Sequence, residues 1–436
     1  MTRYKNFIFI LVLILSLAWG EIVSAKVKKS VLPDGLTVLT KEDHSQPILA
    51  VQLWVKTGSA LEDESNSGVS HFIEHMLFKG TARLPGPEIA KTIEAKGGVI
   101  NAATSKDFTY YHLILPSEQA DTALEVITDI VLNSVLAADE LEKERLVILE
   151  EINRQDDNTQ SVLWNLFNKN IYKTIPYARP VIGTSDTIKN MSRQTLLDYY
   201  HRFYVPNNMS LIIAGDFATG SVMAKIKNIF AAVKAGKLEP AVYTSVNQEA
   251  SLSEDKREVQ QAHLILGTLG PPVTSRDQYA LDIAAYILGG GRSSRLYRKI
   301  QEEKKLVHSI GATFLTLKGQ GPFYITATCE PAKIPLVKEA ILAELSQIKS
   351  EKPSAEELKR AKSIIRSEYL LSNQTYDGQA FNLGYYETVD TYKFNETYLA
   401  NIDKITAEDI LRVVNKYIDP DKMATVIIEP KDKKKK

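Results

Sequence analysis

The sequence predicts an α+β protein of two homologous domains, each with a mainly antiparallel sheet packed against helices. One observation is its length, because 436 residues exceed what a single ordinary core holds. Another is its composition, 44% hydrophobic and 24% charged, which is typical of a folded globular chain. The third is an internal repeat, in which a capped helix, a proline turn and an apolar strand recur 214 residues later.

The first half alternates strand-like and helix-like segments. Runs rich in Val, Leu and Thr predict strands, and apolar residues at helical spacing predict helices. The pair Gly97-Gly98 ends one of these helices, because glycine favours helix termination. Strands are expected at 36–40, at 50–55, once or twice within 101–115 and at 210–214, and helices at 71–78, 87–96, 118–133 and 139–153.

The second half repeats the end of the first. In each copy a serine or threonine caps an amphipathic helix that leads through a proline turn into an apolar strand. The matched pairs are Ser192 with Thr406, Pro206 with Pro420 and Met209 with Met423. We therefore divide the chain into a signal peptide at 1–25, a first domain at 26–236, a polar linker at 237–257, a second domain at 258–430 and a basic tail at 431–436.

The N-terminal segment has the order of a secretory signal peptide. Arg3 and Lys5 precede an apolar run at 7–18, and Val23-Ser24-Ala25 offers the small residues that a signal peptidase reads. The run is shorter than the ~20 residues of a membrane-spanning helix. We predict cleavage after Ala25 and an exported, periplasmic protein without membrane contact; the alternative is an uncleaved anchor.

Charge and cysteine content narrow the possible partners. Lys plus Arg and Asp plus Glu both number 53, so the net charge is zero and nucleic acid is a poor partner. The single cysteine, Cys329, cannot form an internal disulfide and is expected to be a small buried residue of a strand at 323–329.

The segment His71-Phe72-Ile73-Glu74-His75 carries the chemistry. Histidines four residues apart share one helix face, which suits chelation of a tetrahedral metal. Imidazole favours zinc, although manganese or cobalt stays open. Glu74, beside His75, is placed to take a proton from a water whose pKa the metal lowers.

An ordinary polar helix face is the alternative to a metal site. The apolar neighbours of the motif make the helix largely buried, and a buried cluster of two histidines and a glutamate needs a partner. The corresponding residues of the second domain are Leu281, Ala284 and Ala285, so folding alone does not demand the polar cluster. A third ligand is expected on the helix at 139–153, where Glu144 and Glu151 share one face, and spacing alone leaves both open.

The motif resembles the signature of the pitrilysin-like zinc metallopeptidases, an inverzincin family with the inverted order His-x-x-Glu-His. The resemblance extends over the whole mature chain and is closest to the shorter two-domain members, whose subunits pair into a closed chamber. The segments that carry it are 71–81, Gly97-Gly98, Asn101-Ala102 with Thr104, Glu144-Arg145 with Glu151, 179–183 and 204–209.

The resemblance implies a zinc-dependent metalloendopeptidase that hydrolyses small or unfolded peptides in an enclosed cleft, with one zinc ion per chain. Carried over to this sequence, the family's residues are the zinc ligands His71, His75 and Glu151, the general base Glu74, the supporting carboxylate Glu144, and the substrate contacts Asn101, Ala102 and Phe78.

Two features depart from the family pattern. Gln301 and His308 stand where an arginine and a tyrosine usually stabilise the reacting carbonyl, although both can donate a hydrogen bond. We therefore predict the zinc-bearing subunit of a heterodimer with a homologous chain, the alternatives being a homodimer and a non-catalytic structural or peptide-binding relative. Ser161 and Asn165 stand where processing peptidases carry acidic residues, so no arginine preference is predicted.

Overall fold

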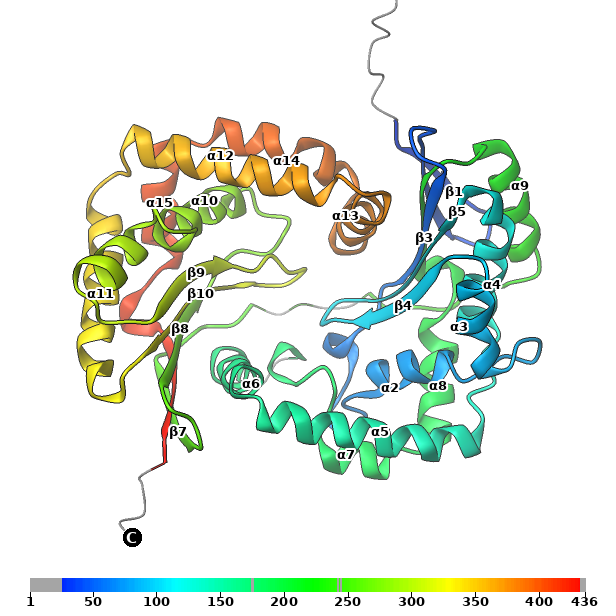
Figure 1. Cartoon of the computed structure of the whole chain (residues 1–436), viewed down its shortest axis with the longest axis horizontal. Coiled ribbons are helices and arrows are strands. Elements are labelled where there is room, and N and C mark those ends of the chain that lie inside the picture. The colour runs from blue at the N-terminus through cyan, green and yellow to red at the C-terminus, as the bar shows by residue number, and fades with distance from the viewer. Residues whose placement is uncertain (1–25, 174–175, 241–242, 244, 432–436) are drawn as a thin grey trace, which may run out of the picture.

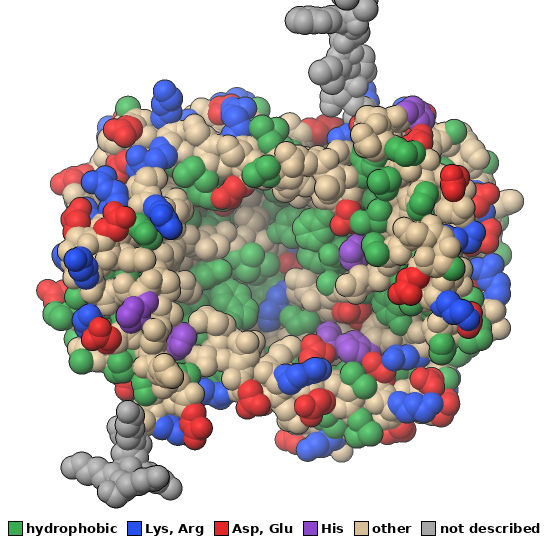
Figure 2. Space-filling model, viewed as in Figure 1, with side chains coloured by type: hydrophobic (Ala, Val, Ile, Leu, Met, Phe, Trp, Pro, Cys, Tyr) green, Lys and Arg blue, Asp and Glu red, His purple; other side chains and the backbone are tan. Residues whose placement is uncertain are grey.

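The computed structural model describes residues 26–173, 176–240, 243 and 245–431. The predicted signal peptide lies outside these residues, as does the basic tail beyond Lys431. Two units, each a sheet with helices, stand side by side around a hollow (Figures 1 and 2). Within the described residues, no helix has both the length and the apolar character needed to cross a membrane.

The first sheet consists of β1 (Lys28–Val31), β2 (Thr37–Glu42), β3 (Ile48–Val55), β4 (Val99–Thr104), β5 (Thr109–Pro116) and β6 (Met209–Gly215). Its spatial order is β1-β2-β6-β3-β5-β4. Only β2 and β6 pair in parallel, and the central strands β3 and β6 are buried because both of their faces are covered. β4 lies at the edge, so one side of its backbone has no strand beside it within this sheet.

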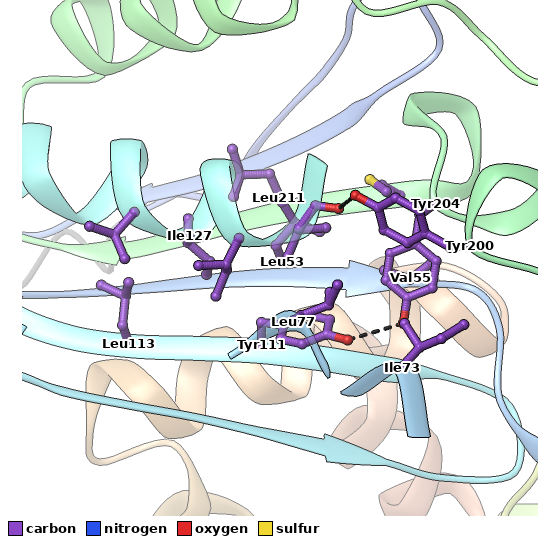
Figure 3. Packing of buried hydrophobic residues seen from close by; sticks show 14 of the residues in the cluster. Leu53, Val55, Ile73, Leu77, Tyr111, Leu113, Ile127, Tyr200, Tyr204 and Leu211 are labelled. Carbon is purple, nitrogen blue, oxygen red and sulfur yellow. Dashed lines mark hydrogen bonds between the residues drawn. The ribbon is translucent and has the colours of Figure 1, made fainter. Parts of the chain in front are cut away.

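Helices of the first half of the chain pack against this sheet. They are α2 (Val69–Leu77), α3 (Gly86–Glu94), α4 (Ala120–Leu132), α5 (Ala138–Asp157), α7 (Ser185–Asn190), α8 (Arg193–Phe203) and α9 (Thr219–Phe230). Leu53 and Leu211 of the central strands share one core with Ile73 and Leu77 of α2 and with Ile127 of α4 (Figure 3). This apolar packing holds α2 against the sheet, and it leaves the other side of the helix for polar residues.

The second sheet consists of β7 (Ser251–Arg257), β8 (Ala262–Leu269), β9 (Ser309–Phe314), β10 (Pro322–Cys329) and β11 (Ala424–Pro430). Its order, β7-β11-β8-β10-β9, corresponds to β2-β6-β3-β5-β4, and the parallel pair β7–β11 corresponds to the parallel pair β2–β6 of the first sheet. The accompanying helices are α10 (Asp277–Gly289), α11 (Ile334–Ser350), α12 (Ala355–Ser372), α14 (Lys393–Lys404) and α15 (Ala407–Tyr417). The predicted α+β fold of two related units is confirmed.

One helix from each half of the chain packs on the sheet of the other half (Figure 1). α6 (Thr159–Tyr172) follows α5 in the chain but packs on β8 and β11 of the second sheet. α13 (Tyr376–Val389) follows α12 but packs on β3 and β6 of the first sheet. Gly384 of α13 lies so close to Trp54 that an added Cβ would be 2.2 Å from the indole nitrogen. The two sheets are therefore each covered by a helix from the other half of the chain.

Several local predictions are confirmed, and one is wrong. The hydroxyls of Ser192 and Thr406 accept hydrogen bonds at the starts of α8 and α15, and Cys329 is buried at the end of β10. The linker predicted at 237–257 is too long, because Ser251–Arg257 forms β7 and pairs in parallel with β11. β7 lies at the edge of its sheet, and its side chains alternate between a half-buried face and an exposed face. Its polar, alternating sequence is therefore compatible with a strand.

Candidate metal centre

The N-terminus of α2 is held by a buried carboxylate. Glu62 accepts hydrogen bonds from the backbone N–H groups of Gly68 at 2.7 Å and Ser70 at 2.9 Å. Burial raises the pKa of Glu62, while these hydrogen bonds act against the rise. Gly68 has φ +94°, and an added Cβ there would lie 2.6 Å from the carbonyl oxygen of Ile182. The helix therefore starts at a position defined by a close backbone contact and by a charge that suits its dipole.

The face of α2 opposite the core brings together the residues of the predicted motif. Phe72, Ile73, Met76 and Leu77 are buried among apolar side chains, whereas His71, Glu74 and His75 are only partly buried. The rings of His71 and His75 lie 4.6 Å apart between centroids. The helical spacing thus places both imidazoles on the side that faces α5 and the hollow.

Glu151 of α5 completes a cluster with the two histidines. Its Oε2 lies 3.7 Å from Nε2 of His71 and 3.6 Å from Nε2 of His75. Two ligand atoms of a tetrahedral zinc lie about 3.4 Å apart, given bonds of about 2.0–2.1 Å. The three residues are the one group of this kind among the described residues whose donor atoms could hold a metal ion.

The outer nitrogens of the two histidines differ in their partners. His75 Nδ1 lies 2.9 Å from Glu144 Oε1, and Lys79 Nζ lies 2.5 Å from Glu144 Oε2. Burial alone would raise the pKa of Glu144, but the hydrogen bonds from His75 and Lys79 outweigh it and hold this pKa below its usual value. In contrast, His71 Nδ1 is buried and has no hydrogen-bond partner among the described residues.

His71 has the protonation state that metal binding requires. Burial, and then the neighbouring His75, lower the pKa of His71 to about 3, so this imidazole is neutral at pH 7. A neutral imidazole offers a lone pair, and Glu151 supplies a carboxylate oxygen. Two nitrogens and one oxygen leave a fourth tetrahedral position open, as in catalytic rather than structural zinc sites. The donor set therefore fits zinc.

Glu74 lies beside this cluster and is tied to β4. Oγ1 of Thr104, the last residue of β4, donates a hydrogen bond to Glu74 Oε2 over 2.5 Å. Burial raises the pKa of Glu74 above its usual value, and the hydrogen bond from Thr104 opposes the rise. The carboxylate is therefore both sheltered and oriented.

The predicted substrate contacts lie on β4 and at the end of α2. Asn101 is exposed on β4, and Ala102 follows it on this edge strand. Phe78 is half-buried, with its ring 6.2 Å from the ring of Tyr111. The structure thus places all three on the unit that carries the metal cluster.

The second unit differs from the first at the corresponding positions. Leu281, Ala284 and Ala285 are buried in α10, as their apolar character suggests. Gln301 lies in a π-helical turn, and its Nε2 donates to the backbone carbonyl of exposed His308 over 3.0 Å. The amide group of Gln301 is therefore already engaged within its own chain.

Sequence reasoning assigned no role to several residues at the site. Thr104 and Lys79 belong to the matched segments, but their contacts to Glu74 and Glu144 join separate elements. Glu62 lies outside every matched segment, although it holds the start of α2. The only signal for Thr104 and Lys79 was their membership of those segments.

Comparison with known proteins relates the chain to one peptidase family. A family model described as insulinase (peptidase family M16) matches residues 37–185, and one described as peptidase M16 inactive domain matches residues 190–365. An uncharacterised zinc protease of Rickettsia felis is 32% identical over 408 residues, covering 92% of this chain and 97% of that protein. An uncharacterised zinc protease of Bacillus subtilis is 28% identical and covers 87% and 94%.

Solved structures share the fold. The crystal structure of a protease from Helicobacter pylori superposes with a TM-score of 0.87 at 25% identity, covering 93% of this chain and 100% of that one. A peptidase M16 inactive domain from Pseudomonas fluorescens gives a TM-score of 0.85 at 23% identity, covering 94% and 99%. Both likenesses extend over more than nine-tenths of this chain, at 93% and 94%.

Proposed function

The chain belongs to peptidase family M16, and from that premise we propose that it is a zinc-dependent endopeptidase in which Glu74 is the general base. The observation that carries the proposal is the convergence of His71, His75 and Glu151, with Glu74 one residue before a ligand. The substrate would be a small or unfolded peptide that enters the hollow between the two units (Figure 2).

One zinc ion per chain would be held by Nε2 of His71, Nε2 of His75 and a carboxylate oxygen of Glu151. When bound, zinc supplies Lewis acidity, which polarises a carbonyl and makes a nearby water more acidic. Glu144 orients His75 through Nδ1, and Lys79 in turn holds Glu144. These supports keep the imidazole in the tautomer that leaves Nε2 free to bind the metal.

Glu74 would move the proton. Its carboxylate takes a proton from the attacking water and returns it to the amine nitrogen of the departing peptide. The raised pKa of Glu74 suits this role, because the group must hold the proton between the two transfers.

The peptide would bind as an added strand on β4. Asn101 and Ala102 present backbone groups on the edge of the first sheet, and an extended peptide can pair with such an edge. Phe78 would lie beside the scissile bond. Recognition through the backbone would not depend on any one side chain of the substrate.

A partner subunit is the second part of the proposal. Gln301 donates one of its two amide N–H groups to the backbone carbonyl of His308, and neither residue is the arginine or tyrosine of the family pattern. We infer that the stabilising donors come from a homologous subunit of a heterodimer, with a homodimer as the alternative. Export to the periplasm by the N-terminal segment would place the assembly outside the cytoplasm.

The decisive test compares the full chain with its Glu74→Gln variant. We expect one zinc per chain in both. The wild-type chain should turn over peptide slowly, because the donors of the partner subunit are absent, and the variant should be about 100- to 10,000-fold slower again, because the proton acceptor is lost as well. Glu150→Gln, an exposed carboxylate on α5, is the matched control and should cleave normally. Zinc retained with equal cleavage by wild type and E74Q would contradict the proposal. Zinc without any cleavage by the wild-type chain would direct the search to the missing subunit.

A further inference from the structure

The hydroxyl of Thr104 joins the proposed peptide-binding strand to the proposed general base. Thr104 ends β4, and its Oγ1 lies 2.5 Å from Glu74 Oε2. We propose that Thr104 is a positioning residue for Glu74, holding one carboxylate oxygen so that the other stays free to exchange a proton with the attacking water. This inference rests on the proposed function, in which Glu74 is the base.

The neighbouring hydroxyl groups define the direction of this hydrogen bond. Thr109 faces Thr104 across the β4–β5 hairpin, and its Oγ1 lies 3.0 Å from the carbonyl oxygen of Thr57 and 3.5 Å from Oγ1 of Thr104. Its single proton is therefore used by the closer carbonyl. Thr104 therefore donates its own proton to Glu74 Oε2, as a general base in its ionised form requires, because an ionised carboxylate can only accept.

The hairpin that carries Thr104 is fixed from its own unit. The backbone N–H groups of Ser59 and Ala60 donate to the carbonyl oxygens of Ser105 at 3.1 Å and Lys106 at 2.8 Å. An added Cβ at Gly58 would lie 2.3 Å from the carbonyl oxygen of Ser105. The turn after Thr104 is thus packed backbone against backbone, which limits its movement.

The second unit holds the same turn from the other side. The carboxylate of Asp107 accepts hydrogen bonds from the hydroxyl of Tyr177 at 2.7 Å and from the backbone N–H of Lys318 at 3.1 Å. Lys318 lies between β9 and β10 of the second sheet. The end of an edge strand is usually mobile, but here two units determine where the hydroxyl of Thr104 lies.

A carboxylate fixed in one orientation is a more effective general base than one that samples several rotamers. A glutamate side chain has several rotamers, and a misplacement of about 1 Å at a reacting group can cost about 100-fold in rate. Loss of the Thr104 hydroxyl should therefore reduce kcat by about 10- to 100-fold, the size expected for one hydrogen bond to a charged group.

A purely structural role for Thr104 predicts a different result. If the hydroxyl only tied β4 to α2, its loss would loosen the peptide-binding strand. KM would then rise with little change in kcat, and the peptide would bind more weakly whether or not Glu74 was present. The two roles are therefore separated by the split between kcat and KM and by binding in a background without turnover.

The experiment uses the full chain with a quenched fluorescent peptide and six proteins: wild type, T104V, T104S, E74Q, the double variant E74Q/T104V and the control T313V. Valine keeps the shape of threonine without the hydroxyl, serine keeps the hydroxyl, and Thr313 is exposed on β9, the corresponding edge strand. Zinc content is measured for each protein, and peptide Kd is measured by fluorescence anisotropy in E74Q with and without T104V.

We expect T104V to lose about 10- to 100-fold in kcat with unchanged KM and zinc content. T104S should recover most of the rate, T313V should match wild type, and T104V should leave the Kd of E74Q unchanged. An unchanged kcat in T104V, a failure of serine to restore it, or a weaker peptide Kd in the double variant would overturn the role of Thr104. Full turnover by E74Q would instead overturn the proposed base and the inference with it.

Discussion

Glu144 lies beside the candidate metal centre and contacts one of its proposed ligands. It is 7% exposed and bridges His75 Nδ1 and Lys79 Nζ. Such an outer carboxylate fixes the tautomer and the orientation of a ligating imidazole. Because His71 Nδ1 lacks a partner among the described residues, the site depends more on Glu144 for the orientation of its ligands.

Removal of Glu144 should therefore weaken zinc binding rather than abolish the fold. We expect Glu144→Ala to raise the zinc Kd by about 10- to 100-fold. Glu144→Gln should have a smaller effect, since its amide oxygen still accepts from His75. The measurement is competition with a chromogenic chelator, with Glu150→Ala as the control. Equal zinc affinity in all four proteins would show that Glu144 does not support the site.

The residues of the site were predictable to different degrees. His71, Glu74 and His75 lie about one turn apart or less on a single helix, so the helical period alone places them together. Glu144 and Glu151 share a face of α5 by their spacing, but only the packing of α2 against α5 shows that this face meets the histidines. The contact of Thr104 with Glu74 joins residues 30 positions apart through a strand and a helix, and no local pattern indicates it.

At the scale of elements, α12 begins with a partly buried ion pair. Arg295 Nε and Nη2 donate to the two carboxylate oxygens of Glu357 at 2.6 and 2.9 Å. Glu357 also accepts from the backbone N–H of Ser354, which completes a capping box. The hydrogen bond from Arg295 is the largest cause that lowers the pKa of Glu357, to about 2, and burial opposes it.

The sign of the pH dependence follows from this shift. The folded pKa of Glu357 lies below the unfolded value of about 4.3, so its contribution to stability is complete above that value and is lost as the pH falls towards 2. Glu357→Gln should lower the free energy of unfolding by about 1–2 kcal/mol at pH 7, less than the shift alone implies, because solvent screens part of the pair.

Urea unfolding followed by circular dichroism at pH 7, 5 and 3.5 tests this prediction. The difference between wild type and E357Q should be similar at pH 7 and 5 and smaller at pH 3.5. The neighbouring Glu356→Gln is the control, because Glu356 is 89% exposed and should matter little at any pH. If the difference in the free energy of unfolding between wild type and E357Q grows as the pH falls, the predicted direction of the pH dependence is wrong.

Sequence patterns predicted an element better when one whole face of it, or all of it, is buried among apolar residues. α15 has apolar residues at helical spacing and a Thr406–Asp409 capping box, and it was expected from the repeat. β7 was assigned to the linker because its residues alternate between half-buried and exposed and include no run of apolar side chains. What makes it a strand is its pairing with β11, a segment about 170 residues later, which no local pattern contains.

At the scale of the whole molecule, the exchange of α6 and α13 makes the two units interdependent. Each helix buries part of its surface on the sheet of the other unit, and its sequence alone does not show which sheet it covers. α13 also makes a polar contact with the first sheet, in which Gln52 Nε2 of β3 donates to Asp377 Oδ1 at 2.8 Å. Removal of α13 would take this acceptor away from the buried Gln52 side chain.

The exchange also bears on the hollow between the units (Figure 2). A hinge at the connection between α9 and β7 alone would have to pull α6 and α13 from the sheets that they cover. This would expose two apolar surfaces, one of them formed around Trp54 and Phe108. We therefore expect the relation of the two sheets to be rigid, so that a substrate peptide must adapt to the hollow instead of closing it.

The same interdependence predicts how fragments of the chain behave. Residues 26–236 contain the whole metal cluster but lack α13, so the face of the first sheet that α13 covers would be exposed to water. That face is formed by Leu39, Ala50, Trp54, Ile212 and Ala214, all fully buried in the intact chain. Residues 237–431 would likewise lack α6. We expect each fragment alone to aggregate or to remain loosely packed, with little bound zinc.

Co-expression of the two fragments should restore the fold, because each supplies the helix that the other lacks. A chain with an engineered protease site between α9 and β7, cut after folding, is the control and should stay associated on size-exclusion chromatography. Zinc content and the near-ultraviolet circular dichroism of the packed aromatic residues report recovery. If residues 26–236 alone bind zinc as tightly as the full chain and show native circular dichroism, α13 is not required for the first unit to fold. The first unit would then be an independent domain, and the exchange could not account for the rigid spacing of the two sheets.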